Sequence, residues 1–137
     1  DDHDRADLPK VFDRWVRVFI DTVRREFCPN CGSHIDPTLR MDIEDVGVGI
    51  SYACDRCPQA PLLSPGMFLV GEPEVVSFFH RHGVDLSARP VWQTEFLMLP
   101  TGGIVSETPL VVERRIQAGD EVLVTTLDRS LAVTYER

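Results

Sequence analysis

The stretch that decides the fold runs from residue 28 to residue 57 and reads CPNCGSHIDPTLRMDIEDVGVGISYACDRC. It opens with the pair Cys28 and Cys31 and closes with the pair Cys54 and Cys57, which are all the cysteines of the chain. A C-x2-C turn places two thiolates on one side of a tight knuckle, and two facing knuckles supply a sulfur tetrahedron. The spacing therefore predicts one zinc ion per chain, bound by Cys28, Cys31, Cys54 and Cys57.

A closed set of four thiolates leaves no position for water, so the predicted zinc is structural rather than catalytic. Iron remains an alternative ion, because tetrathiolate sites also hold iron. Disulfides would suit an exported protein, and a thioredoxin-like centre would need only one C-x-x-C pair. His34 follows Cys31 by three residues and is a weaker candidate for a spare ligand.

Between the knuckles, residues 35–43 and 46–52 are expected to form a hairpin that turns near Glu44 and Asp45. The segment 46–52 alternates apolar residues with small or polar ones, as a half-buried strand does. Gly47 and Gly49 remove side chains from one face and favour a close approach, which we expect from the first helix. Knuckle, hairpin and knuckle together predict a zinc ribbon.

Residues 8–27 are predicted to form an amphipathic helix, because apolar residues recur at steps of three and four. Asp7 is a candidate N-cap and Pro9 lies in the first turn. The apolar surface is wider than one stripe, so the helix is expected to be buried on more than one side. Two interpretations stay open: a core helix, or a helix that packs on a second subunit or an upstream domain through Trp15, Phe19 and Val23.

The whole sequence predicts an α+β fold of four parts. These are an N-terminal amphipathic helix, a four-cysteine zinc-ribbon hairpin, a short helix and a C-terminal antiparallel β-meander. Residues 58–71 are rich in Pro and Gly and are expected to form a loop. The short helix is expected over 73–82, ending at Gly83. Four strands are predicted over 92–99, 110–116, 121–127 and 131–135. We expect 1–27 to act as connector or dimerisation helix, 28–60 as ribbon, and 61–137 as short helix plus sheet, packed together as one domain.

The apolar region from Phe78 to Trp92 has two possible interpretations. It is either a helix end and turn that lead into the sheet, or one wall of a ligand pocket with Trp92 as lid or floor. His80 and His82 lie two apart on the predicted helix, so they point to different faces and are not expected to chelate a metal together.

The chain has 22 acidic and 14 basic residues, a net charge of −8 and a single lysine, Lys10. This balance indicates either adaptation to very high salt, as in a halophilic archaeon, or an arginine-rich genome. Phosphate binding needs clustered Lys and Arg, so no direct DNA binding is expected from this chain alone.

No apolar run reaches membrane-spanning length and no signal peptide is visible, which predicts a cytoplasmic protein. No nucleotide-binding or hydrolase motif is present, which argues against an enzyme.

The CPNCG…CDRCP pairs, LLSPG, FFHRHGVDL, PVW and the SETPLVV…GDEVLVTTLDRSLAV segment together resemble the C-terminal domain of haloarchaeal ArsR-like winged-helix transcription regulators. The resemblance covers about residue 27 to the end, and only its zinc motif is specific. It implies a regulatory domain that follows a DNA-binding winged helix, with zinc at the four cysteines. Only 27 residues precede Cys28, too few for a winged helix, and residue 1 is not Met. We therefore expect the DNA-binding domain to lie upstream.

The leading hypothesis is a non-catalytic regulatory and dimerisation domain of a transcription regulator, whose partners are a second copy and the upstream domain. The alternative is a free-standing zinc ribbon that binds nucleic acid or the transcription machinery. That alternative needs basic residues near the knuckles, where Arg25, Arg40 and Arg56 are the candidates. A small enzyme would need an open metal position or a polar cleft.

Overall fold

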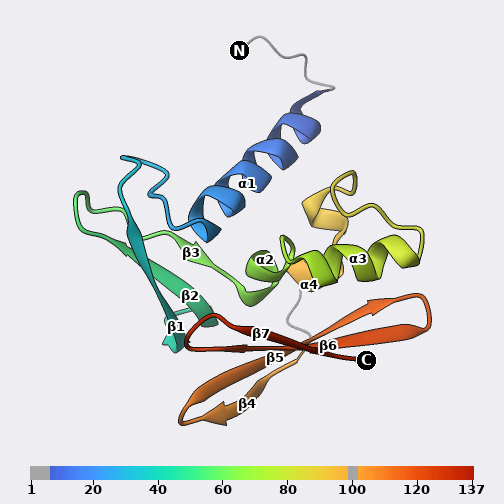
Figure 1. Cartoon of the computed structure of the whole chain (residues 1–137). Coiled ribbons are helices and arrows are strands. Elements are labelled where there is room, and N and C mark those ends of the chain that lie inside the picture. Colours follow the sequence, from blue (N-terminus) through green and yellow to red (C-terminus); the bar gives the residue numbers. More distant parts are fainter. Residues whose placement is uncertain (1–6, 99–101) are drawn as a thin grey trace.

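Helices and two antiparallel sheets make up the computed structural model, which describes residues 7–98 and 102–137 (Figure 1). The predicted α+β class is confirmed. A three-stranded sheet has the order β1-β2-β3, and a four-stranded sheet has the order β4-β5-β6-β7. The strands are β1 Ile35–Ile43, β2 Gly47–Cys54, β3 Leu62–Leu63, β4 Ile104–Glu107, β5 Leu110–Ala118, β6 Glu121–Asp128 and β7 Val133–Glu136. The helices are α1 Leu8–Arg24, α2 Pro65–Leu69, α3 Pro73–Arg81, the 3-10 turn η2 Val91–Gln93 and α4 Glu95–Met98.

Helix α1 begins as predicted, with Pro in its first turn, although the Asp7 side chain makes no cap hydrogen bond. It ends at Arg24, earlier than the predicted residue 27. The cause is Glu26, which has a φ of 64° and so leaves the helical region. Phe27 then forms an isolated antiparallel bridge with His34 and belongs to the ribbon.

The ribbon hairpin is confirmed, with Asp45 at a φ of 64° in its turn. Residues 58–71 are not the predicted loop throughout, because β3 pairs with β2 and adds a third strand. Helix α2 follows directly, and its N-cap Ser64 accepts a hydrogen bond from the Met67 N–H at 3.1 Å. A Cβ at Gly49 would lie 2.9 Å from Ile43 Cδ1, so the close approach comes from within the ribbon sheet and not from α1.

Helix α3 matches the prediction closely, and Gly83 just beyond it has a φ of 75°. The strand predicted over 92–99 is wrong: residues 91–93 form η2 and residues 95–98 form α4. Leu99, its last residue, lies outside the described part. The Thr94 hydroxyl donates to the Pro90 carbonyl at 3.2 Å, which closes a local turn where an extended strand would have none.

The C-terminal meander has four strands as predicted, but its first strand is β4 instead of residues 92–99. Strands β5 and β6 pair in continuous register from Val111–Asp128 to Ala118–Glu121. Burial alternates along both strands, so Val112, Ile116, Leu123 and Leu127 face inward. One face of the sheet therefore packs on the rest of the molecule.

The layers meet at helix α2, which contacts α1, β2 and β3, while α4 contacts both α2 and β5. Figure 1 shows α2 and α3 between α1 and the C-terminal sheet, with the ribbon to one side. The buried apolar side chains of the ribbon, the helices and the C-terminal sheet form one cluster. Within residues 7–98 and 102–137, no helix combines the length and apolarity needed to cross a bilayer.

Candidate metal centre

The ribbon brings the two cysteine pairs together through its strand register. In an antiparallel hairpin the start of the first strand lies beside the end of the second, and Ile35 pairs with Cys54. The first knuckle closes when the Gly32 N–H donates to the Cys28 carbonyl at 2.9 Å and the Cys28 N–H donates to the Ser33 carbonyl at 2.8 Å. Gly32 has a φ of 76°, which few other residues adopt.

All four sulfur atoms lie within 4.8 Å of one another. The Sγ atoms of Cys28 and Cys57 are 3.5 Å apart, as are those of Cys31 and Cys54, and Cys54 and Cys57 are 3.6 Å apart. A regular tetrahedron with metal–sulfur bonds of about 2.3 Å has edges of about 3.8 Å. The sulfurs are also too far apart for disulfides, which need about 2.0 Å. The four cysteines are thus positioned to bind one metal ion.

Backbone N–H groups direct hydrogen bonds at the sulfur atoms, as a knuckle requires. Those of Cys31 and Asn30 lower the pKa of Cys28. The Ser33 hydroxyl and N–H, together with the Cys54 thiol, lower the pKa of Cys31 to about 6. These donors favour the thiolate form, which is the form that binds metal.

Cys54 shows the opposite shift, and the contrast has a physical cause. The Arg56 N–H lowers the pKa of Cys54, but burial and the neighbouring thiols outweigh it and raise the pKa to about 11. Without a cation, four adjacent sulfurs do not all ionise, because like charges at this distance repel. A divalent metal ion removes that repulsion, so the donor set fits a bound cation.

The cysteines differ in exposure: Cys28 is 2% exposed and belongs to the core cluster, whereas Cys31 is exposed. The ion would therefore lie at the edge of the molecule, with one ligand in the core. His34 is not part of the sulfur cluster. Its Nε2 lies 2.9 Å from Asp36 Oδ1, on the outside of the ribbon.

The predicted partner surface on the first helix is only partly a surface. Trp15 is 62% exposed and Phe19 is partly buried, but Val23 is fully buried and belongs to the core. Trp92 is 41% exposed, in η2. Rings connect these positions: Phe12 stacks on Trp15 at 6.5 Å and meets Trp92 at 6.5 Å, and Trp15 stacks on Phe19 at 6.0 Å.

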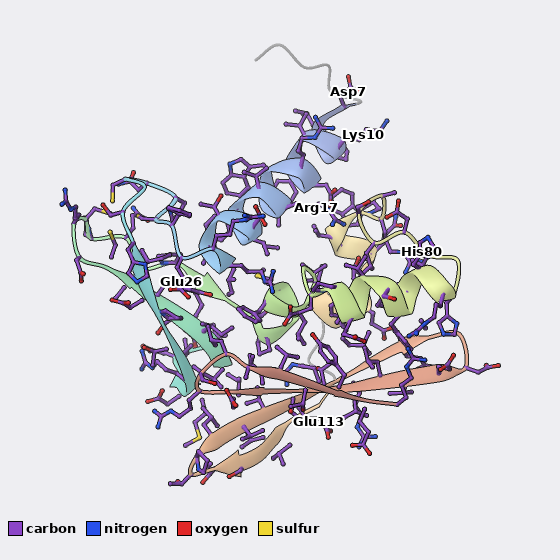
Figure 2. All side chains as sticks on the ribbon, in the orientation of Figure 1. Asp7, Lys10, Arg17, Glu26, His80 and Glu113 are labelled. Atoms are coloured by element: carbon purple, nitrogen blue, oxygen red, sulfur yellow. The ribbon has the colours of Figure 1, made fainter. Side chains whose placement is uncertain are left out.

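Two polar contacts that the sequence did not predict hold α1 in place. The first joins α1 to residues 86–91: Asp13 accepts from the Val91 N–H at 2.7 Å, and Arg17 donates to the carbonyls of Leu86 and Arg89. Asp13 and Arg17 also pair with each other at 3.1 Å. In Figure 2, Arg17 lies on the side of α1 that faces this segment.

The second contact is the partly buried ion pair between Arg24 and Glu72, 3.3 Å apart. The Arg24 guanidinium also lies 4.6 Å from the centre of the Phe68 ring. A Cβ at Gly71 would come within 2.5 Å of the guanidinium, so the backbone at Gly71 makes room for it. The Asp13–Arg17 pair joins residues four apart on one helix, whereas the Arg24 contact depends on the tertiary fold.

Trp92 and Pro90 line a groove of about 580 Å³ between α1 and residues 87–92, together with Lys10, Arg14 and Arg17. A second cavity of about 310 Å³ lies elsewhere, between Phe79, Phe96, Arg89 and Arg115. The pocket wall predicted from Phe78 to Trp92 is therefore divided between two cavities. His82 takes part in neither: it pairs with Glu121 at 3.1 Å.

The basic residues near the knuckles are partly engaged by acidic neighbours. Arg25 pairs with Asp21 at 3.1 Å, and Arg40 pairs with Asp42 at 3.2 Å. These pairs lower the positive potential that a phosphate backbone would require.

Comparison with known proteins gives one family. A family profile described as a domain of unknown function (DUF7351) matches residues 1–133. No curated protein and no solved structure matches the chain.

Proposed function

The chain belongs to the DUF7351 family, and from that premise and the site geometry we propose that it is a non-catalytic regulatory domain of a transcription regulator. In this proposal a structural zinc ion bound by Cys28, Cys31, Cys54 and Cys57 stabilises the ribbon. A DNA-binding winged helix is supplied by a segment outside residues 1–137. The ribbon and α1 then form the connection between that segment and the C-terminal sheet.

The observation that carries the proposal is the closed set of four sulfur ligands. Four protein ligands complete a tetrahedral zinc shell, so no position is left for a substrate or an activated water. Zinc suits the site because thiolates are soft ligands and zinc prefers four of them in a tetrahedron. The metal then contributes folding free energy instead of chemistry.

The charge distribution supports a role without direct DNA contact. The chain carries a net charge of −8, and carboxylates engage Arg25 and Arg40 beside the knuckles. A zinc ribbon that binds nucleic acid would present such arginines to phosphates. A row of exposed aromatic side chains on α1 provides a protein-binding surface instead.

Three measurements test this function. Elemental analysis of the purified chain should give one zinc per chain; iron in its place would correct the ion. The coding sequence upstream of residue 1 should encode a winged helix, and the complete gene product should bind DNA while residues 1–137 alone should not, even at low salt. Nucleic-acid binding by residues 1–137 alone, or the absence of an upstream DNA-binding domain, would contradict the proposal.

A further inference from the structure

One face of α1 is apolar and exposed along the length of the helix. Phe12, Trp15 and Val18 are 55%, 62% and 60% exposed, and Leu8 is 43% exposed. Val11, Phe19 and Thr22 lie on the same face and are half-buried. Together the seven residues form what we call the exposed stripe. Apolar side chains of this size are seldom left in water as a contiguous group unless they form a binding surface.

Helix α1 buries little of itself against its own chain. Of its 17 residues, only Ile20 and Val23 are buried. In proteins most of the stability of a helix comes from packing an amphipathic face. The exposed stripe is therefore a second packing face whose partner is a separate surface.

We propose that this partner is the exposed stripe of a second copy, with the two α1 helices antiparallel and the twofold axis at Trp15. The inference rests on the proposed function, since it names the partner of the regulatory domain. A twofold interface joins one patch to itself, so the patch must be self-complementary under reversal.

The stripe has this symmetry. Its residues 8, 11, 12, 15, 18, 19 and 22 lie symmetrically about position 15. In an antiparallel pair Leu8 lies opposite Thr22 of the partner subunit, Phe12 lies opposite Val18 of the partner subunit, and Trp15 meets Trp15 of the partner subunit. The positions also follow the three- and four-residue steps by which helices pack side by side. Every member of the stripe thus meets another member.

The area is sufficient for such a pair. An aromatic side chain has about 200 Å² of surface, so the exposed parts of Phe12, Trp15 and Trp92 amount to roughly 300 Å². Leu8 and Val18 raise the total to roughly 500 Å² per copy. Two copies would then bury about 1,000 Å² of mainly apolar surface, which is about the minimum for a specific interface. Trp92 lies beside Phe12 and extends the patch beyond the helix.

The first test is the mass of the purified, metal-loaded chain by sedimentation or light scattering, at low and at molar salt. A dimer has twice the 15.5 kDa of one chain. Trp15→Asp places two carboxylates at the axis and should give monomers, and so should Val18→Asp. Both side chains are exposed, so neither change should disturb the fold, which circular dichroism and zinc content verify. Val105→Asp is the control. Val105 lies on β4 and is 60% exposed, as Val18 is, so this variant should remain dimeric.

The second test determines whether the two α1 helices run antiparallel or parallel. Leu8→Cys and Thr22→Cys chains of different tag size are mixed and treated with a short bismaleimide. Antiparallel helices give the mixed Leu8→Cys–Thr22→Cys product, whereas parallel helices give only like-with-like products. The untreated and wild-type chains are the controls, because metal-bound thiolates react slowly.

A wild-type monomer at every concentration, dimers that survive Trp15→Asp, or like-with-like cross-links would each overturn the pairing. A monomer that still holds one zinc would leave the proposed function standing. Loss of zinc in the wild-type chain would instead count against the proposed function.

Discussion

The ribbon sheet β1-β2-β3 and the C-terminal sheet β4-β7 have the same antiparallel hydrogen bonding but different means of stabilisation. In the C-terminal sheet, buried residues alternate along β5 and β6, and all of them are apolar except Arg114 and Thr125. In the ribbon, the knuckle end holds four sulfurs, and beyond the middle of the hairpin Met41 and Val46 are 42% and 51% exposed. The ribbon residues Ile35, Leu39 and Ile50 are as buried as those of the C-terminal sheet, so both sheets share one apolar core. What distinguishes the ribbon is the additional support that a cation would give to its knuckle end.

The largest effect is expected from Cys54→Ser, because it removes one of four ligands. Structural zinc contributes on the order of 10 kcal/mol to small metal-dependent folds, so the ribbon should lose its order while β4-β7 keeps part of its structure. Hydrogen exchange by mass spectrometry measures both sheets in one experiment. His34→Ala is the matched control and should keep one metal per chain, since His34 lies outside the sulfur cluster. Equal loss of protection in both sheets would remove the distinction between them.

Leu127→Ala tests the other side of the comparison. Leu127 is 1% exposed on β6, and truncation of a buried leucine costs about 2–5 kcal/mol. Denaturant unfolding at fixed salt should show this loss, while zinc content of the folded chain stays at one. Val122→Ala on the outer face of the same strand should cost less than about 1 kcal/mol, because Val122 is 38% exposed. A similar loss for both variants would show that burial on β6 is not what stabilises the sheet.

Arg24→Met probes how α1 is held against α2 and Glu72, in the layer of helices beside the two sheets. Arg24 and Glu72 are each 19% exposed, and Arg24 also contacts the Phe68 ring. Removal of the guanidinium leaves the Glu72 carboxylate without its cationic partner and should cost about 1–3 kcal/mol in denaturant unfolding. Arg25→Met is the control, because it removes a local i,i+4 pair with Asp21 whose side chains are 70% and 60% exposed. That control should cost less than about 0.5 kcal/mol, and an equal cost for both would contradict a role for Arg24 in holding α1 against α2 and Glu72.

The smallest effect concerns pH. In the metal-free protein, Cys31 with a pKa of about 6 is mainly thiolate at pH 7, whereas Cys54 with a pKa of about 11 holds its proton. Metal binding at pH 7 must therefore release the Cys54 proton. Below about pH 6 the metal must also displace a proton from Cys31, so apparent affinity should fall more steeply there. Competition with a chromophoric chelator measures this dependence.

Ser33→Ala is the control for the pH dependence. The Ser33 hydroxyl is the main cause of the lowered pKa of Cys31, so its removal should move the steep region to higher pH. An unchanged profile would show that the hydroxyl does not set the ionisation of Cys31.

The metal ligands and the hairpin could be predicted because their signals are local. Two C-x2-C pairs fix the knuckles, and alternation over residues 46–52 fixes the strand. The end of α1 was mispredicted because Glu26 takes a left-handed conformation that is usually left to Gly. The helical turns at 91–98 were mistaken for a strand, because a short apolar run has no distinct period.

The tertiary contacts had no local signal at all. Asp13 bonds to Val91, which is 78 residues away along the sequence, and Arg24 pairs with Glu72, which is 48 residues away. The burial of Val23 likewise depends on what packs against α1, since its helical spacing equals that of exposed Trp15 and half-buried Phe19. Periodicity identified the apolar residues of this helix but not which of them face the core.

Helix α1 is a rigid rod fixed at two points about 16 Å apart, Asp13 with residues 86–91 and Arg24 with Glu72. Just beyond Arg24 the Ile35 N–H donates to the Glu26 carbonyl at 3.1 Å, which ties the rod to the ribbon strand that follows the first knuckle. Because both contacts hold the same helix, a tilt of α1 at the Arg24 end would also displace the contact at Asp13. We therefore expect the amide proton of Val91, which donates to Asp13 and is remote from the cysteines along the chain, to shift when metal binds or is removed.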